Sequence, residues 1–329
     1  MSNQLLFGME VALNGLMAGV MYALVALGFV LIFKASGIFN YAQGVMALFA
    51  AMTLVGIQNG QVPFAHLINA TFGTNIHHFG WQVPALLAIL LTVVVMAGFA
   101  WLVNRYIFRH LVNQEPIILF MATIGLAYFL EGVADLMWGA EIKTLDVGLP
   151  QGINDWIDTT TFEIFGYGFF IDNLDIVATI IAALLVAGLV AFSQYTKQGR
   201  ALRAVADDHQ AALSVGISLN FIWVLVWSIA GFVALVAGIM WGAKSGVQFS
   251  LSLIALKALP VLMLGGFTSI PGAIIGGLII GVGEKLFEFL IGAPYLGGAT
   301  ENWFAYVLAL IFLVFRPQGL FGEKIIERV

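Results

Sequence analysis

The chain has 329 residues, of which 61% are hydrophobic and only 9% are charged, and its mean hydropathy is +1.00. A soluble domain carries about 25% charged residues, so this chain cannot cover its own surface with polar groups and needs lipid around it. The net charge of −5 argues against nucleic-acid binding. With no cysteine, the chain offers no disulfide, no thiolate metal site and no cysteine nucleophile.

Runs of 18 or more nearly uncharged residues predict membrane-spanning helices along most of the chain. The segment 251–267 reaches only about 25 Å at 1.5 Å per residue, so we predict either a full span or a half-span that enters and returns. The expected fold is therefore an all-α bundle of about eight or nine spans, a single transmembrane domain over 1–329 with a short or broken helix near 251–272. The predicted spans are 9–33, 35–58, 84–104, 116–138, 174–194, 219–243, 251–267, 270–292 and 299–315.

Lysine and arginine gather between alternate spans, and such clusters are typical of cytoplasmic loops. The clusters are Arg105 and Arg109, then Lys197, Arg200 and Arg203, then Arg316, Lys324 and Arg328. The segment 139–175 carries seven acidic residues and one lysine, which predicts an exterior acidic loop over 139–173. This alternation predicts an N-terminus outside and a C-terminus in the cytoplasm.

Polar side chains interrupt the first spans. Asn40, Tyr41 and Gln43 begin the second span, and Tyr22 and Thr123 are weaker candidates of the same kind. Amides and phenols need hydrogen-bond partners in lipid. We expect these groups either to bond to neighbouring helices or to line a path across the membrane. Two carboxylates one turn apart, Glu131 and Asp135, suggest an acid/base pair or a proton relay. The alternative is that Asp135 lies at the membrane interface and Glu131 is paired within the bundle.

The interior segment 195–219 predicts a short amphipathic helix between two spans. Its expected apolar stripe is Leu202, Ala206, His209 and Leu213, with Gly199 before the helix and Gly216 ending it. Such a helix either docks into a groove of a partner or rests on lipid headgroups. Arg203, Asp207 and Gln210 are expected to point away from the stripe.

Glycines mark the segment after residue 258. Gly265, Gly266, Ser269, Gly272 and Gly276 form a turn and the start of the next helix, and Ser269 is expected to cap that helix. Small residues four apart, as at Gly15–Gly19, Gly272–Gly276, Gly277–Gly281 and Gly238–Gly242, favour close helix packing. The turn is expected to act as a hinge or a second contact surface.

Charged residues follow in the same helix. Glu284, Lys285 and Glu288 are expected to sit at the membrane interface, where they pair with each other or snorkel, or else to contact an exterior binding protein or line an outer vestibule. The exterior histidines at 66, 77 and 78 are expected to be solvated, so no metal site is predicted. No loop is large enough to bury a core, and no Walker-type glycine loop is present. Any energy for transport must come from another chain or from an ion gradient.

Four blocks of sequence resemble one known family. They are "GRALRAVADD" at 199–208, Tyr22–Met52 with its Asn-x-Ala-x-Gly turn, the glycine-rich block Leu259–Glu284, and "FRPQGLFG" at 315–322. Together they resemble the branched-chain amino acid permeases of bacterial ABC importers. The family often has His where Gln43 stands and an acidic residue where Val45 stands, and these departures leave the substrate open.

The resemblance implies a non-enzymatic permease subunit of an ATP-driven importer in the bacterial inner membrane. It implies a periplasmic binding protein, two cytoplasmic ATPase subunits that hold ATP and Mg, no cofactor on this chain, and a second homologous permease chain or a homodimer. The substrates would be branched-chain or related small amino acids. Alternatives are a permease for urea or amides and an ion-coupled secondary transporter of small organic solutes. The implied ATPase-coupling residues are Gly199, Arg200, Leu202, Arg203, Ala206, Asp207, Leu213 and Gly216.

Overall fold

The computed structural model describes residues 3–111, 114–207 and 209–322, without the side chain of His209. Apart from three isolated β-bridges, regular structure in these ranges is helical. The chain forms two compact units, each assembled from segments that are distant in sequence. The first unit contains Met1–Val30, Leu149–Ala187 and Leu256–Val329, and the second contains Leu31–Gly148 and Gly188–Ala255.

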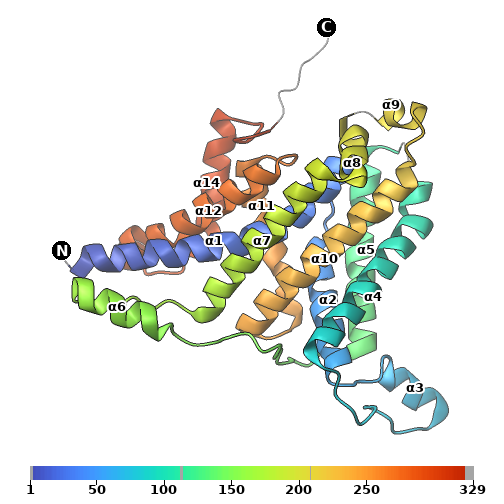
Figure 1. The fold of residues 1–329 in the computed structure, drawn as a ribbon, viewed down its shortest axis with the longest axis horizontal. Helices are drawn as coiled ribbons and strands as arrows, with labels where there is room; N and C mark the ends of the chain where they lie inside the picture. Colours follow the sequence, from blue (N-terminus) through green and yellow to red (C-terminus); the bar gives the residue numbers. More distant parts are fainter. Residues whose placement is uncertain (1–2, 112–113, 208, 323–329) are drawn as a thin grey trace. The chain divides into compact units, whose positions relative to one another are not determined.

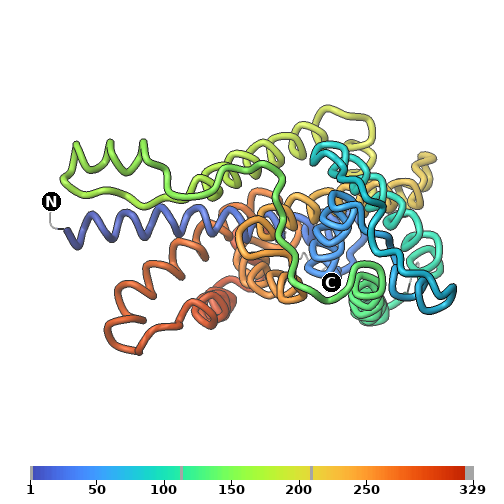
Figure 2. The backbone as a smooth tube through the Cα atoms, turned by 90° about the horizontal axis from the view of Figure 1, so that it is seen from below, coloured from blue at the N-terminus to red at the C-terminus, as the bar shows by residue number. Residues whose placement is uncertain are grey.

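The second unit is built around α10 (Leu219–Ser245), which packs against α4 (Ala85–Tyr106) and α2 (Gln43–Gln58). Helix α5 (Pro116–Trp138) packs on the other side of α2. Figures 1 and 2 show these four helices together. The other elements of this unit are α3 (Ala65–Phe72), η1 (Phe108–His110), α8 (Lys197–Asp207), α9 (His209–Ser214) and η2 (Phe249–Leu253).

Small residues let the helices of the second unit approach closely. A Cβ on Gly238 of α10 would collide with the carbonyl oxygen of Ala47 on α2, and a Cβ on Gly56 would collide with the ring of Trp138. Between the helices, Trp227 is fully buried and stacks on Phe108, with 4.7 Å between ring centroids. Because lipid provides no hydrophobic force between helices, such close contacts hold them together.

The first unit contains most of α1 (Asn3–Ser36), much of α7 (Asn173–Tyr195) and nearly all of α11 (Ile254–Gly265). In Figure 2, α6 and the chain after it run beside the start of α1, where Leu6, Phe169 and Ile171 form a buried cluster. The remaining elements are α6 (Asp155–Phe165), α12 (Ile270–Phe287), the π-helical turn η3 (Glu288–Gly292), α13 (Ala293–Leu296) and α14 (Glu301–Phe315).

Helices α1 and α12 meet through their glycines. A Cβ on Gly15 would lie 2.8 Å from the carbonyl oxygen of Gly281, and Gly19 faces Gly277 in the same way. Contacts of this length are essentially never made by real Cβ atoms, so alanine does not fit without a shift. The glycine spacing seen in the sequence is therefore the contact seam of this helix pair.

The short apolar segment near 251–267 is one arm of a bent helix pair. Phe249–Gly265 and Ile270–Leu296 are inclined by 113° to each other across the turn between them. Ser269 caps α12, its Oγ accepting a hydrogen bond of 3.0 Å from the Gly272 amide. The sequence predicts both the break and the cap.

Five helices of the described chain are long and apolar enough to cross a membrane, and α2 and α14 are shorter apolar helices. The predicted start of the second span at residue 35 is wrong. Helix α1 continues to Ser36, Gly37 then adopts a positive φ of +67°, and α2 begins only at Gln43. The surface helices α3 and α6 were not predicted, because neither carries a long apolar run.

Candidate functional site

The segment after α7 carries the most amphipathic helix. Gly199, Leu202 and Val205 form the buried face of α8, which contacts α10. Gly199 lies against the backbone of Phe192 and Ser193, where a side chain would collide. Arg200, Arg203 and Asp207 are exposed on the opposite face.

Three sequence predictions for this segment are wrong. Gly199 lies inside α8, because the helix begins at Lys197 and needs a residue without a side chain at this contact. The expected single helix is two helices, α8 and α9. The expected stripe also fails, since Ala206 is only half-buried and Leu213 is 53% exposed, while Val205 and Ala212 are buried. The stripe shifts because the buried face of α8 follows residues 199, 202 and 205. The side chain of His209 lies outside the described residues.

Gly216 ends α9 in the left-handed conformation, with φ +85°, as the sequence predicts. Its amide donates to the Leu213 carbonyl at 3.0 Å, and the Ile217 amide donates to Ala212 at 3.0 Å. Ser218 then caps α10, with its Oγ accepting from the Phe221 amide. The turn between α9 and α10 is therefore closely defined.

The exposed side of α9 lines a cavity of about 690 Å³ at one end of the second unit. In Figure 1, α8 and α9 lie at the end of the second unit opposite to α3. Leu213 lines this cavity together with residues at the ends of α1, α5 and α10. The cavity is lined by Ser36, Gly37, Leu111, Gln114, Pro116, Leu119, Gln210, Leu213, Ser214, Leu219 and Trp223.

Four of the predicted path residues come together at the start of α2. Asn40, Gln43 and Thr123 are buried and hydrogen-bonded. Asn40 Nδ2 donates to Gln43 Oε1 at 3.3 Å, and Gln43 Nε2 donates to the Ala230 carbonyl at 3.4 Å. Thr123 Oγ1 accepts from the Tyr41 amide at 3.1 Å and donates to the Phe39 carbonyl. These amides and this hydroxyl therefore hold the turn before α2, and Tyr41 alone is substantially exposed.

The fifth predicted path residue, Tyr22, belongs to a buried charged cluster in the first unit. Lys257 Nζ lies 2.8 Å from Glu284 Oε1, and the Tyr22 hydroxyl donates to the same oxygen at 3.3 Å. Lys257 also donates to the Glu301 carbonyl at 2.6 Å. Glu284 is only 1% exposed, and its Oε2 has no hydrogen-bond partner among the described residues.

The expectation that Glu284, Lys285 and Glu288 pair with each other is wrong. Glu284 pairs with Lys257, and Lys285 forms an ion pair with Glu301 at 2.9 Å. Glu288 accepts hydrogen bonds from the Ala299 and Thr300 amides and from the Thr300 hydroxyl. Adjacent positions point in different directions around a helix, so each charge meets a different neighbour.

Lys257 is the functional candidate that sequence reasoning missed. It stands in the predicted short span 251–267 without a carboxylate on its own helix, and an unpaired lysine in an apolar segment was an available signal. Its partner lies 27 residues away on α12, and only the bend between the helices brings the two together.

The turn before α12 is closed by the end of the described chain. The Leu320 amide donates to the Leu264 carbonyl at 2.8 Å, and the Phe321 amide donates to Gly265 at 3.2 Å. Gly265 lies against Gly272, and Gly276 lies against the Val261 carbonyl and Gly265. The "FRPQGLFG" segment therefore satisfies backbone groups that the bend leaves open.

The opposite end of the second unit holds a buried lysine and the exposed histidines. Lys143 Nζ donates to the Gln61 side chain and the Trp138 carbonyl, and burial lowers its pKa although Glu141 acts in the other direction. His66, His77 and His78 are exposed around a cavity of about 620 Å³. The described residues contain no group of three or more acidic or histidine side chains placed to hold a metal ion.

Comparison with known proteins gives a consistent result over the whole chain. The family model described as branched-chain amino acid transport system / permease component matches residues 11–316. The high-affinity branched-chain amino acid transport system permease protein LivH of Escherichia coli (strain K12) is 28% identical over 100% of both chains. BraD of Pseudomonas aeruginosa, with the same description, is 29% identical over 96% of both chains. A probable LivH of Methanocaldococcus jannaschii is 26% identical over 91% of this chain and 88% of its own.

The match covers nearly all the apolar helices and the bent pair described above. The four blocks that resemble the family in the sequence all lie within or overlap the matched range. This chain therefore belongs to the family of branched-chain amino acid transport permeases and is a multi-pass membrane protein.

Proposed function

We propose that this chain is the permease subunit of an ATP-driven importer and forms a translocation path for branched-chain or related small amino acids. The observation that carries the proposal is the position of α9 beside a cavity lined by the ends of several spans, with α8 in contact with α10. The named functions of its full-length relatives support the same assignment.

The coupling segment has two faces with different tasks in this proposal. Gly199, Leu202 and Val205 form the buried face of α8, which contacts α10, and Gly199 lies against the end of α7. Leu213 and the exposed charges of α8 remain available to a partner. A helix of this kind fits a groove on a soluble subunit, with an apolar anchor surrounded by polar contacts.

The remaining subunits follow from this role. Two cytoplasmic ATPase subunits would bind ATP and Mg and move α8 and α9, while a periplasmic binding protein would deliver the amino acid. A second homologous permease chain, or a second copy of this one, would complete the path. The N-terminus would lie outside and the C-terminus in the cytoplasm of a bacterial inner membrane, because the basic residues at the end of α4 and along α8 then face the cytoplasm.

Leu213→Asp tests the coupling role. Because Leu213 is exposed, the change should leave the fold intact while burying a charge in the docked interface. We expect ATP-driven uptake into proteoliposomes, and co-purification of the ATPase subunits, to fall at least about tenfold. Leu67→Asp is the matched control, since Leu67 is similarly exposed at 58% on α3. Undiminished co-purification with Leu213→Asp would refute the docking role.

A secondary transporter coupled to an ion gradient is the second candidate, and the buried Lys257–Glu284 pair favours it. Ionisable groups within spans often mark ion and proton pathways. Uptake by the purified chain alone, driven by a pH or sodium gradient without ATPase subunits, would support this candidate and contradict the first. Competition of leucine uptake by urea or small amides would separate the substrate classes.

A further inference from the structure

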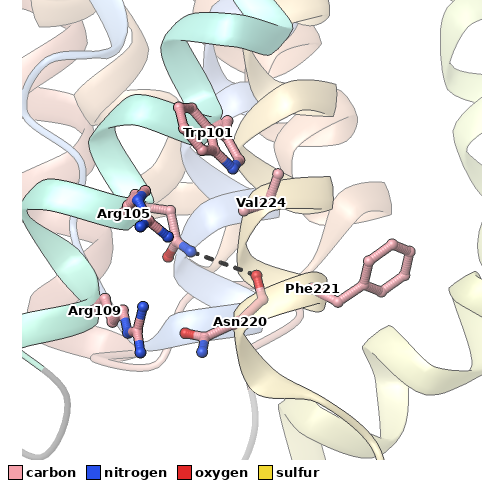
Figure 3. Close-up of a pocket in the computed structure, with 7 residues that line it drawn as sticks. Trp101, Arg105, Arg109, Asn220, Phe221 and Val224 are labelled. Atoms are coloured by element: carbon pink, nitrogen blue, oxygen red, sulfur yellow. Dashed lines mark hydrogen bonds between the residues drawn. The ribbon is translucent and has the colours of Figure 1, made fainter.

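A separate cavity of about 320 Å³ lies where α4 ends and α10 begins. Figure 3 shows the guanidinium groups of Arg105 and Arg109 beside Asn220, with Trp101 one turn away. Asn104, Phe221 and Val224 complete the lining. All seven residues belong to the second unit, and none is part of the coupling segment.

The two arginines make no ion pair among the described residues. Arg105 lies over the Trp101 ring, with 5.7 Å from its Cζ to the ring centroid, and both arginines are exposed residues. The first turn of α10 adds the partial positive charge of a helix N-terminus. The lining of the cavity therefore presents two positive charges, and none of its seven residues is acidic.

One buried polar atom in the cavity lining also lacks a partner. Asn104 is 4% exposed, and its Nδ2 donates to the Asn220 carbonyl at 3.5 Å. Its Oδ1 is buried and has no hydrogen-bond partner among the described residues. An unsatisfied acceptor of this kind suits a hydroxyl donor.

An apolar surface continues from the cavity along α4. Leu90, Val94, Trp101 and Leu102 are exposed there, and Phe221 is exposed on the α10 side. The cavity occupies the last two turns of a helix that is long enough to cross the membrane. Charge at the end of a span, beside an apolar strip along it, matches the two parts of a phospholipid.

We infer that this cavity binds an anionic phospholipid, with its phosphodiester between Arg105 and Arg109 and an acyl chain along α4. Guanidinium groups bind phosphate oxygens through paired, charge-assisted hydrogen bonds. A headgroup hydroxyl, as in phosphatidylglycerol, would donate to Asn104 Oδ1. Basic pockets between spans are known to hold anionic headgroups. The lipid would connect α4 to α10 and stabilise their contact.

Native mass spectrometry of the purified full chain tests this inference, with phosphatidylglycerol and phosphatidylcholine titrated in turn. Arg105→Gln/Arg109→Gln should weaken phosphatidylglycerol binding about 30-fold, because each basic group near an anionic headgroup contributes about 1 kcal/mol. Arg200→Gln/Arg203→Gln removes the same charge from α8, away from the cavity, and should change the affinity less than about twofold. Trp101→Ala should also weaken lipid binding.

Other ligands in this cavity would give different results. Equal binding of phosphatidylcholine, or displacement of the lipid by inorganic phosphate, would overturn the lipid assignment. Unchanged phosphatidylglycerol binding by the double glutamine variant, together with loss of the ATPase subunits, would assign the cavity to a protein partner instead. Melting curves in lipid-free detergent check the fold, since both arginines are exposed and their variants should melt as the wild type does.

Discussion

Replacing Lys257 with methionine isolates the energetic role of the buried ion pair. The methionine fills a similar volume, but Glu284, at 1% exposure, loses its counter-ion and keeps the Tyr22 hydroxyl as its remaining side-chain hydrogen-bond donor among the described residues. Removing one member of a buried pair typically destabilises a protein by about 3–5 kcal/mol, because the other charge remains desolvated. We expect a loss of that size in the free energy of unfolding.

The neighbouring pair supplies the control. Lys285 and Glu301 are 2.9 Å apart, but their side chains are 34% and 33% exposed. Pairs in that environment contribute about 0–1 kcal/mol, so Lys285→Met should have little effect. Lys257 is also partly exposed, at 21%, which places its expected effect toward the lower end of the range.

Unfolding in mixed micelles with increasing SDS, followed by tryptophan fluorescence, measures both variants. The double variant Lys257→Met/Glu284→Met should recover most of the free energy of unfolding that Lys257→Met loses, because apolar replacement of a whole buried pair is often neutral or stabilising. Equal effects of Lys257→Met and Lys285→Met would contradict the reasoning. A double variant as unstable as Lys257→Met would also do so, since packing rather than charge would then explain the loss.

Two further predictions concern glycines. Gly15→Ala should destabilise the α1–α12 contact by about 1–3 kcal/mol through overpacking against Gly281, and thermal melting should separate it from Gly125→Ala, whose Cβ meets open space; equal melting temperatures would argue against the seam. Gly319 has φ +80°, and a Cβ at this position would collide with the Gly266 backbone in the bend. Gly148 has a similar φ of +77°, but a Cβ there would meet no atom within 4 Å. Gly319→Ala and Gly148→Ala are therefore a matched pair. Both alanine variants should be destabilised by about 1 kcal/mol or more, because alanine is strained in the left-handed conformation. Only Gly319→Ala should also loosen the bend, and increased proteolysis near residue 266 would detect this.

The sequence predicts most of the spans because their signal is local. Apolar length, proline at helix starts and a serine cap act within a few residues, so 116–138 and the Ser269 cap agree with the structure. The predicted start of the second span at residue 35 is wrong because α1 continues to Ser36. Residues 37–42 then form a turn whose apolar residues have the hydropathy of a helix. Hydropathy does not distinguish an apolar turn from an apolar helix.

The candidate sites were harder to predict because they depend on contacts distant in sequence. The buried residues of α8 are set by the elements that it packs against, and so Val205 is buried where the sequence predicts Ala206. The partner of Lys257 is fixed by the 113° bend. Amphipathicity indicates that a helix has a buried face, but the neighbouring helix determines which residues form it.

Two clusters of buried polar side chains, one in each unit, differ in charge: the cluster in the second unit is neutral, and the cluster in the first unit contains an ion pair. In the second unit, Asn40, Gln43 and Thr123 bond to backbone carbonyls, to each other and to the turn before α2. In the first unit, Lys257 and Glu284 bring full charges into an apolar setting and leave one carboxylate oxygen unsatisfied. Neutral amides would join helices at a lower desolvation penalty. Comparing the uptake of Lys257→Met/Glu284→Met with its stability therefore separates a structural contact from a role in transport. A stable double variant that no longer transports would place the charge pair in the transport cycle, whereas normal uptake would leave it a structural contact.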